Sequence, residues 1–410
     1  MERQSVRGSD KERNAEVTKR RREVGNALFN RFLREILTDE QKKEFENQYN
    51  RVRNATHNPD YSKVPIVTPI NATYNGDPLK LRDIQRTGAG FLVNKGVGGL
   101  AFEVGGGKTM TSIIAVNEIM ARGWAKKPLI VVEKNNYRKW IDKELKEIVP
   151  GVVINELANL GNRFKGDLAT LEIPEGSFSV MTVEGFQRLG FSDQTYNEIT
   201  GDLEDIVTDI SFGEKSKRQQ AKDTEKLNES MGKARRKISG DRSFEELGFD
   251  LVLLDEAHIY KNLFTGAKTK SGEGNEYKNV RGGSSSTRAI KAFFATQYVL
   301  KRNNNRNVFL LTATPFTNSP LEYYSMLMFM ARARLQALGL NNVNDFMTAF
   351  MDLSTTFKVK ADQSIQEQDV IERFRNANEL RKLIREFYDF KSGEELGVVR
   401  PEKVAKQFFV

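Results

Sequence analysis

One stretch of the chain combines residue types that suit binding of a phosphate chain and a metal ion. Lys108 and Thr109 follow directly on three glycines, Gly105, Gly106 and Gly107. Glycines let backbone N–H groups turn toward a phosphate chain without interference from a Cβ atom. A lysine in this position reaches the terminal phosphates, and the threonine hydroxyl ligates Mg²⁺. The loop therefore predicts a binding site for a nucleoside triphosphate and Mg²⁺.

The flanks of this loop support the prediction with one departure. An apolar run precedes it, and a helical pattern over Met110–Arg122 follows, so that the positive end of a helix would face the anion. In the full pattern G-x-x-x-x-G-K-[ST] the first glycine is replaced here by Phe102. Taken alone, the loop also fits a glycine-rich surface turn beside a chance Lys-Thr pair, so other segments must decide.

An acidic pair follows an apolar strand in the segment LVLLDEAH at 251–258. Ligands of open α/β sheets bind at the carboxyl ends of the strands. There Asp255 would hold Mg²⁺ opposite Thr109, and Glu256 would polarise the attacking water. The alternative for this pair by itself is a helix N-terminus stabilised by acidic side chains.

A second strand pattern, VFLLTATP at 308–315, ends in two hydroxyls, Thr312 and Thr314. They would sense the state of the phosphates, or they would merely cap the next helix. GKT, DEAH and TATP occur in this order, each at the end of an apolar strand. Together they predict a nucleoside triphosphatase far more strongly than any one of them does.

The elements that must position these motifs read as an α/β fold with a central parallel sheet covered by helices on both faces. Short apolar strands alternate with helical segments between residues 61 and 330, which we assign to one ATP-binding lobe. Residues 1–60 form a charged helical segment, and the residues from about 195 to 241 form a charged helical insertion. Residues 331–410 are expected to be a helical tail.

Composition limits the class of protein. The chain has 410 residues, 39% of them hydrophobic, a net charge of +9 and no cysteine. The positive charge favours a polyanionic partner, and two widely separated histidines without cysteines argue against a zinc site. No apolar run approaches the ~20 residues that span a bilayer. We therefore expect a cytoplasmic protein without a membrane partner.

These motifs resemble those of the first motor lobe of a Swi/Snf-type enzyme of helicase superfamily two. LRDIQ at 81–85 is similar to that family's adenine-recognition motif, which implies that Arg82 and Gln85 bind the nucleotide. The family's phosphate loop usually lacks the first glycine, so Phe102 agrees with it. The resemblance implies a RecA-like P-loop NTPase lobe that uses ATP and Mg²⁺, with His258 coupling the acidic pair to Thr312 and Thr314.

Further segments resemble the family's DNA-contacting motifs. LIVVEKNNYRKW at 129–140 is similar to the motif after the second strand, although Glu133 stands where proline is common. The implied contacts with the DNA backbone come from Lys134, Arg138, Lys139 and Thr182. Such contacts bring affinity with little choice of sequence. Exposed basic residues such as Lys134 and Arg138 are equally consistent with a solvated surface.

The wider resemblance is to large phage- and plasmid-borne proteins that join such a motor to an adenine DNA methylase. The Asn318/Glu322 spacing is similar to that of the Swi/Snf branch and not to that of RNA-directed relatives. The Lys261-Asn262 pair resembles the end of the same family's extended second motif. The resemblance implies an ATP-dependent translocase or helicase motor on duplex DNA, in the cytoplasm of a bacterium or a phage-infected host. The sequence holds no Q-x-x-G-R-x-x-R-like segment, so we expect a second RecA-like lobe in a longer protein or another chain. The alternative is a non-hydrolytic module that binds ATP and DNA, or a partner protein.

Overall fold

A computed structural model of the chain describes most of the residues between 20 and 395. The described ranges are 20–21, 23–25, 27–29, 31–49, 59–157, 171–199, 243–263, 286–316, 320–359 and 365–395. Most of the expected insertion, the residues from 200 to 242, lies outside them, as does Asn318. The chain divides into two compact units, residues 1–58 and residues 59–410.

The first unit is helical where it is described. It contains a π-helical turn, η1 (Phe32–Ile36), and the helix α2 (Asp39–Tyr49). A capping box begins α2: Thr38 Oγ1 accepts from the Gln41 N–H at 3.3 Å, and Gln41 Oε1 accepts from the Thr38 N–H at 3.0 Å. The Thr-Asp-Glu-Gln pattern at 38–41 predicts such a helix start, and the structure confirms it.

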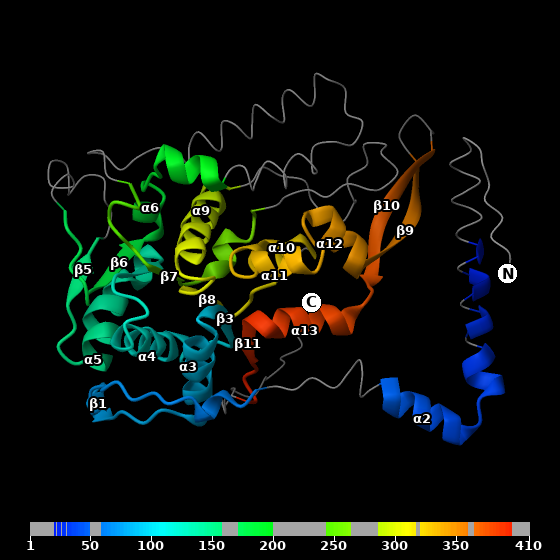
Figure 1. Ribbon diagram of the computed structural model, residues 1–410, viewed down its shortest axis with the longest axis horizontal. Coiled ribbons are helices and arrows are strands. Elements are labelled where there is room, and N and C mark those ends of the chain that lie inside the picture. The colour runs from blue at the N-terminus through cyan, green and yellow to red at the C-terminus, as the bar shows by residue number, and fades with distance from the viewer. Residues whose placement is uncertain are drawn as a thin grey trace, which may run out of the picture. The chain divides into compact units, whose positions relative to one another are not determined.

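The second unit is built on a seven-stranded parallel sheet with the strand order β11-β3-β8-β7-β4-β6-β5 (Figure 1). Its strands are β3 (Val97–Phe102), β4 (Pro128–Val132), β5 (Ile154–Glu156), β6 (Phe178–Thr182), β7 (Leu251–Leu254), β8 (Val308–Leu311) and β11 (Tyr388–Lys391). Every residue of the five inner strands is buried. This explains why they appear in the sequence as continuous apolar runs. The predicted α/β lobe with a central parallel sheet is confirmed.

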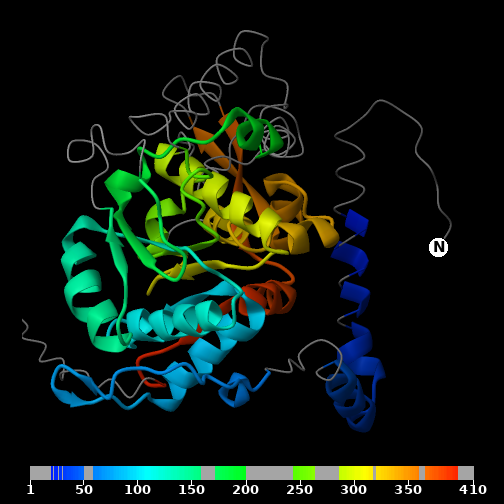
Figure 2. The ribbon, with the colours of Figure 1, turned by 60° about the vertical axis from the view of Figure 1, so that its left-hand side comes forward.

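Helices cover both faces of this sheet (Figures 1 and 2). Successive strand residues point to opposite faces, so Leu129 and Val131 join one buried cluster, and Ile130 and Val132 join the other. The first cluster contains residues of α9 (Thr287–Arg302), α10 (Pro320–Met328), α12 (Val343–Phe350) and α13 (Ala377–Phe387). The second contains residues of α3 (Asp83–Lys95), α4 (Lys108–Ala121), the π-helical turn η5 (Lys139–Leu145) and α5 (Lys146–Ile148).

The C-terminal region differs from the expected helical tail. It contains α11 (Arg332–Ala337), α12 and α13, but also an antiparallel hairpin of β9 (Met351–Val359) and β10 (Ile365–Phe374). In addition, β11 pairs with β3 and extends the central sheet. Gly99 allows this pairing, because a Cβ atom there would overlap the ring of Tyr388. The central sheet therefore includes residues well beyond 330.

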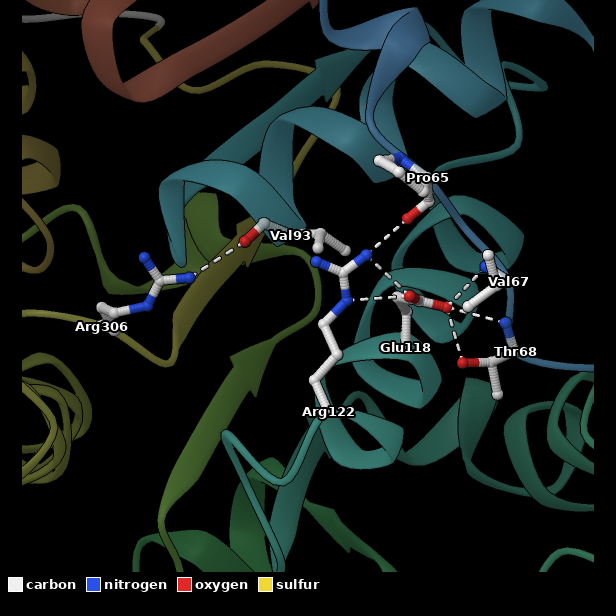
Figure 3. Close-up of polar contacts among 7 residues, drawn as sticks. All are labelled: Pro65, Val67, Thr68, Val93, Glu118, Arg122 and Arg306. Atoms are coloured by element: carbon white, nitrogen blue, oxygen red, sulfur yellow. Dashed lines mark hydrogen bonds and ion pairs between the residues drawn. The ribbon is translucent and has the colours of Figure 1, made fainter.

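A buried carboxylate on α4 holds the segment that precedes α3 (Figure 3). Glu118, whose side chain has 0% exposure, accepts from the Val67 N–H at 2.9 Å and from the Thr68 N–H at 2.8 Å. The Thr68 hydroxyl (2.6 Å) and Arg122 (2.8 Å) also donate to it. Burial by itself would raise the pKa of Glu118, but these hydrogen bonds outweigh that effect and lower it. The segment at 65–68 is thereby tied to the helix that begins at the phosphate loop.

We expect Glu118→Gln to destabilise the second unit by about 1–3 kcal/mol at pH 7, because it removes the charged acceptor of several partly buried donors. The lowered pKa makes the carboxylate's contribution fully present above the ordinary glutamate pKa and lost as the pH falls through the folded-state value. The difference in urea-unfolding free energy between the two proteins should therefore shrink on acidification. Glu175→Gln, which removes an exposed ion pair with Lys126, is the control and should cost under about 0.5 kcal/mol.

Candidate functional site

The carboxyl ends of three adjacent strands bring the predicted motifs together. In the order β3-β8-β7, the glycine loop follows β3, Thr312 follows β8 and Asp255 follows β7. This edge is where open α/β sheets bind ligands. The structure therefore places the GKT, TATP and DEAH segments at a single sheet edge, although more than 200 residues separate GKT from TATP in the sequence.

The glycine loop turns directly into α4. Gly105 and Gly107 have φ angles of +81° and +83°, a region that side-chain-bearing residues rarely adopt, and Gly107 is the N-cap of α4. Lys108 Nζ donates to the Phe102 carbonyl at 2.9 Å, across the base of the loop. Burial lowers the pKa of Lys108, against the opposing charges of Glu256 and Asp255. The lysine cation thus lies in a partly dehydrated position within reach of the acidic pair.

The predicted nucleotide-binding residues ahead of α3 contact the same loop. Gln85 Oε1 accepts from the Arg82 N–H at 2.9 Å, which fixes the glutamine side chain at the start of the helix. A Cβ atom at Gly107 would overlap Gln85 Nε2, so glycine is required there for this packing. The Arg82 guanidinium donates to the Gly105 carbonyl at 3.4 Å. The structure therefore joins Arg82 and Gln85 to the phosphate loop.

Asp255 is a buried carboxylate that accepts hydrogen bonds from two donors. It is 5% exposed; its Oδ2 accepts from Trp140 Nε1 at 2.9 Å, and its Oδ1 accepts from the Glu256 N–H at 3.0 Å. Burial raises the pKa of Asp255 to about 6, and the nearby charge of Glu256 adds to the rise. The Trp140 and Glu256 N–H donors and the Lys108 charge act against it. A cation at this carboxylate would offset the free-energy cost of burying its negative charge.

The donor set at this edge fits Mg²⁺. Among the residues that the structure describes, no group of three or more His, Asp or Glu side chains gathers to form a metal cage. Mg²⁺ is usually held by one or two carboxylates together with substrate phosphates and water, so such a cage is not needed. Asp255 supplies a carboxylate, and Thr109, whose hydroxyl is of the oxygen type that Mg²⁺ prefers, lies in the first turn of α4.

Glu256 has a strained backbone and contacts His258. Its φ and ψ angles of 46° and 49° are left-handed, which costs a non-glycine residue about 1 kcal/mol or more and is typical of functional sites. His258 Nδ1 lies 3.2 Å from Glu256 Oε2 and 3.4 Å from Thr312 Oγ1. Thr312 Oγ1 in turn accepts from the Thr314 N–H at 3.1 Å. His258 therefore connects the acidic pair to the TATP segment.

A buried ion pair makes a second connection between these segments. Lys261 Nζ lies 2.9 Å from Glu322 Oε1, with side-chain exposures of 18% and 6%. It joins the 3₁₀ turn η7 (Ala257–Tyr260), which follows the acidic pair, to α10, which follows TATP. The sequence marks both residues as family signatures but does not indicate that they pair. No local pattern could reveal it, because 61 positions separate them.

The predicted DNA-contacting residues divide into an exposed group and a buried residue. Lys134 is exposed, Arg138 pairs with Glu156 at 2.9 Å, and Lys139 pairs with Glu144 at 3.7 Å. The Arg138–Glu156 pair, 61% and 39% exposed, is weak enough to be exchanged for a phosphate, whereas the Glu144 partner of Lys139 is buried. Thr182, by contrast, is 3% exposed, and its hydroxyl accepts from the Gly185 N–H as the N-cap of α6 (Val183–Phe186). Its contact with DNA stays a prediction.

The described residues contain no helix that is both long and apolar enough to cross a membrane.

The chain is similar to several known proteins. Over 92% of its length the chain is 25% identical to "Defense against restriction protein B" of Escherichia phage P1, and it spans 18% of that protein. Among solved structures it is similar to the Sulfolobus solfataricus SWI2/SNF2 ATPase core in complex with dsDNA, at a TM-score of 0.42 and 13% identity over 77% of this chain and 45% of that one. The same core domain solved separately gives a TM-score of 0.42 and 14% identity over 82% and 47% of the two chains.

The family match covers the acidic pair and the TATP segment, but not the glycine loop. The model of the family described as "Probable helicase domain" matches residues 180–392, just over half of the chain. This range runs from β6 to β11 and includes the acidic pair, His258, Thr312 and Thr314. The chain therefore belongs to this family of helicase domains.

Proposed function

We propose that this chain is the ATP-binding lobe of a Swi/Snf-type motor that hydrolyses Mg·ATP and couples the hydrolysis to movement on duplex DNA. The observation that carries the proposal is the meeting of three groups at one sheet edge. These are the Lys108 cation on a glycine loop, the buried carboxylate of Asp255 and the strained Glu256. A purely structural loop would not require a buried aspartate and a partly buried lysine at this edge.

Each residue has a defined part in this proposal. The backbone N–H groups of the loop and the N-terminus of α4 bind the phosphates. Lys108 exchanges the Phe102 carbonyl for the terminal phosphates, while Asp255 and Thr109 hold Mg²⁺. The ion, when bound, neutralises charge that develops on the transferring phosphate. Glu256 orients the attacking water and takes its proton, and His258 passes the change to Thr312.

The exposed basic residues after β4 are proposed to contact the DNA backbone. Neutralising Lys134 and Arg138 together should weaken duplex binding on all sequences alike. Loss of two phosphate contacts should reduce the slope of log K against log salt by about 1.8, since each contact contributes about 0.9. The measurement is fluorescence anisotropy of labelled duplexes over a range of salt concentrations.

A matched control for this test removes two exposed lysines elsewhere on the same unit. Lys63 and Lys126 have side-chain exposures of 84% and 58%, and Lys126 lies just before β4, at the opposite end of that strand from Lys134. The Lys63→Ala/Lys126→Ala protein has the same change in net charge and should keep the wild-type slope. Equal slopes for wild type and the Lys134/Arg138 variant would place the DNA contact on another surface.

A second RecA-like lobe is proposed to complete the motor. Arginine fingers that stabilise the transferring phosphate typically contribute ~10³–10⁵ in rate, and the sequence has no segment of the usual finger pattern. The phage relative is much longer than this chain, and its name concerns defence against restriction. We propose that a complementary lobe, in the same longer protein or another chain, supplies these fingers.

The test of the whole proposal is ATP turnover by this chain with and without duplex DNA, beside a direct Mg·ATP binding measurement. DNA-stimulated turnover that Lys108→Ala removes supports the motor. Lys108-dependent binding without turnover supports an ATP-binding lobe that lacks its partner, and addition of a second lobe should then restore turnover. Binding of ATP that does not depend on Lys108 would refute the proposal.

A further inference from the structure

Trp140 occupies a position between the exposed basic residues and the buried acid. It lies in η5, directly after Arg138 and Lys139, whose side chains are 61% and 60% exposed. The indole itself is 2% exposed, and its Nε1 donates to Asp255 Oδ2 at 2.9 Å. One short helical segment thus presents charges to the outside and reaches the floor of the nucleotide site.

This hydrogen bond helps to set the orientation of the carboxylate. Asp255 receives one donor on each oxygen, Trp140 on Oδ2 and its neighbour's backbone N–H on Oδ1. A carboxylate held by both oxygens cannot rotate freely, so its remaining lone pairs keep a fixed direction. The Trp140 donor comes from a segment 115 positions away in the chain, whereas the other is local. Only the Trp140 bond therefore changes when η5 moves relative to β7.

The backbone of η5 supports a functional interpretation. It is a π-helical turn over seven residues, a geometry that is rare and frequently found at functional sites. The same turn buries Ile141 and Leu145 against α4-side core residues, so it is well packed rather than frayed. A rigid turn of this kind transmits a displacement of its exposed residues to Trp140.

We propose that Trp140 is a positioning residue that orients Asp255 for Mg²⁺ and links this orientation to contacts made by Arg138 and Lys139. The inference rests on the proposed ATP site and names a regulatory connection within it. Engagement of the two basic side chains by an anionic backbone would shift η5 and thereby change the Trp140–Asp255 bond. Metal affinity and occupancy of the basic surface would then depend on each other.

The first test compares nucleotide binding by wild type, Trp140→Phe and Trp124→Phe. Trp140→Phe keeps an aromatic ring but removes the N–H donor; Trp124, the other tryptophan, is 44% exposed and serves as the matched control. A ribose-labelled, non-hydrolysable ATP analogue is titrated without Mg²⁺ and then at increasing Mg²⁺. We expect the half-saturating Mg²⁺ concentration to rise about 10-fold in Trp140→Phe, with Mg-free nucleotide affinity within twofold of wild type.

The split between the two constants separates positioning from folding. If nucleotide affinity and Mg²⁺ affinity weaken equally, Trp140 has only a structural role. If neither changes, the hydrogen bond is unimportant. Either result overturns the inference. If Lys108→Ala binds the nucleotide analogue as tightly as wild type does, the proposed site itself is refuted. Trp124→Phe should match wild type throughout.

A second measurement does not depend on the stability of Trp140→Phe. The Trp124→Phe protein retains Trp140 as its only tryptophan, so its emission reports the environment of the Asp255 partner. We expect Mg²⁺ added to the nucleotide-bound protein to shift this emission. Duplex DNA should shift it as well, and Arg138→Ala/Lys139→Ala should remove the DNA effect alone. Constant emission under saturating Mg²⁺ and DNA would overturn the proposal.

Discussion

Replacing Lys108 by alanine should weaken nucleotide binding by at least about 100-fold. Lys108 is the cation within the glycine loop, and its Nζ already lies 2.9 Å from the Phe102 carbonyl. Partial burial increases the strength of its interaction with an anion, because water screens it less. Two hydrogen bonds to phosphate oxygens at about 1.5–3 kcal/mol each amount to a factor of 100 or more in Kd. Equilibrium titration with a labelled ATP analogue measures it.

The matched control is Lys134→Ala, which removes a lysine from just after the next strand of the sequence, β4. Lys134 is exposed and lies outside the glycine loop, so nucleotide affinity should stay within about twofold of wild type. Thermal unfolding of both variants should resemble that of wild type, since neither change opens a buried cavity. Unchanged nucleotide affinity in Lys108→Ala would remove this loop from the nucleotide site.

The central strands could be predicted from the sequence because burial on both faces leaves a continuous apolar pattern. Apolar runs in the sequence predict strands at 128–132, 178–182 and 308–311, and these are the observed bounds of β4, β6 and β8. The short strand β5 is less well defined: the sequence indicates residues 152–154, and the structure has Ile154–Glu156. Its three residues are only partly buried, so no apolar run marks them.

The addition of β11 to the sheet was not predicted. Tyr388–Lys391 mixes aromatic and charged residues, and it follows α13 without a break. What places it in the sheet is a non-local fit: the Tyr388 ring lies against Gly99, nearly 290 positions earlier. The pattern of neighbouring residues does not contain this information. The prediction of a helical tail is therefore wrong for these residues.

The candidate site likewise combines features that the sequence predicts with contacts that only the fold reveals. Its motifs were found because each is local: glycines before Lys-Thr, an acidic pair after a strand, hydroxyls after another. Their meeting depends on the strand order β3-β8-β7-β4, which single-sequence patterns do not reveal. Likewise, the contacts from Trp140 to Asp255 and from Lys261 to Glu322 join distant segments and appear only in the folded chain. Residue types are local information, whereas partners are a property of the fold.

Glu256→Gln should leave Mg·ATP binding within a few-fold of wild type and lower the rate of hydrolysis by about 10²–10⁴-fold. Glutamine has the shape of glutamate but cannot accept a proton from water, and a positioned general base typically contributes this factor. The strained backbone at residue 256 and the 3.2 Å contact with His258 hold the side chain in a fixed place, which is what such a base requires. Single-turnover phosphate release, with protein in excess over ATP, measures the rate.

Glu184→Gln provides the matched control, because Glu184 is an exposed glutamate just after the carboxyl end of β6, two strands from Asp255 in the sheet. It removes the same charge near the same edge without touching the acidic pair, so its hydrolysis rate should stay close to wild type. Binding and hydrolysis reduced together in Glu256→Gln would indicate that Glu256 supports the bound nucleotide rather than the attacking water. A wild-type rate would assign the base to another residue. The two variants thus separate the electrostatics of the sheet edge from the chemistry of one carboxylate.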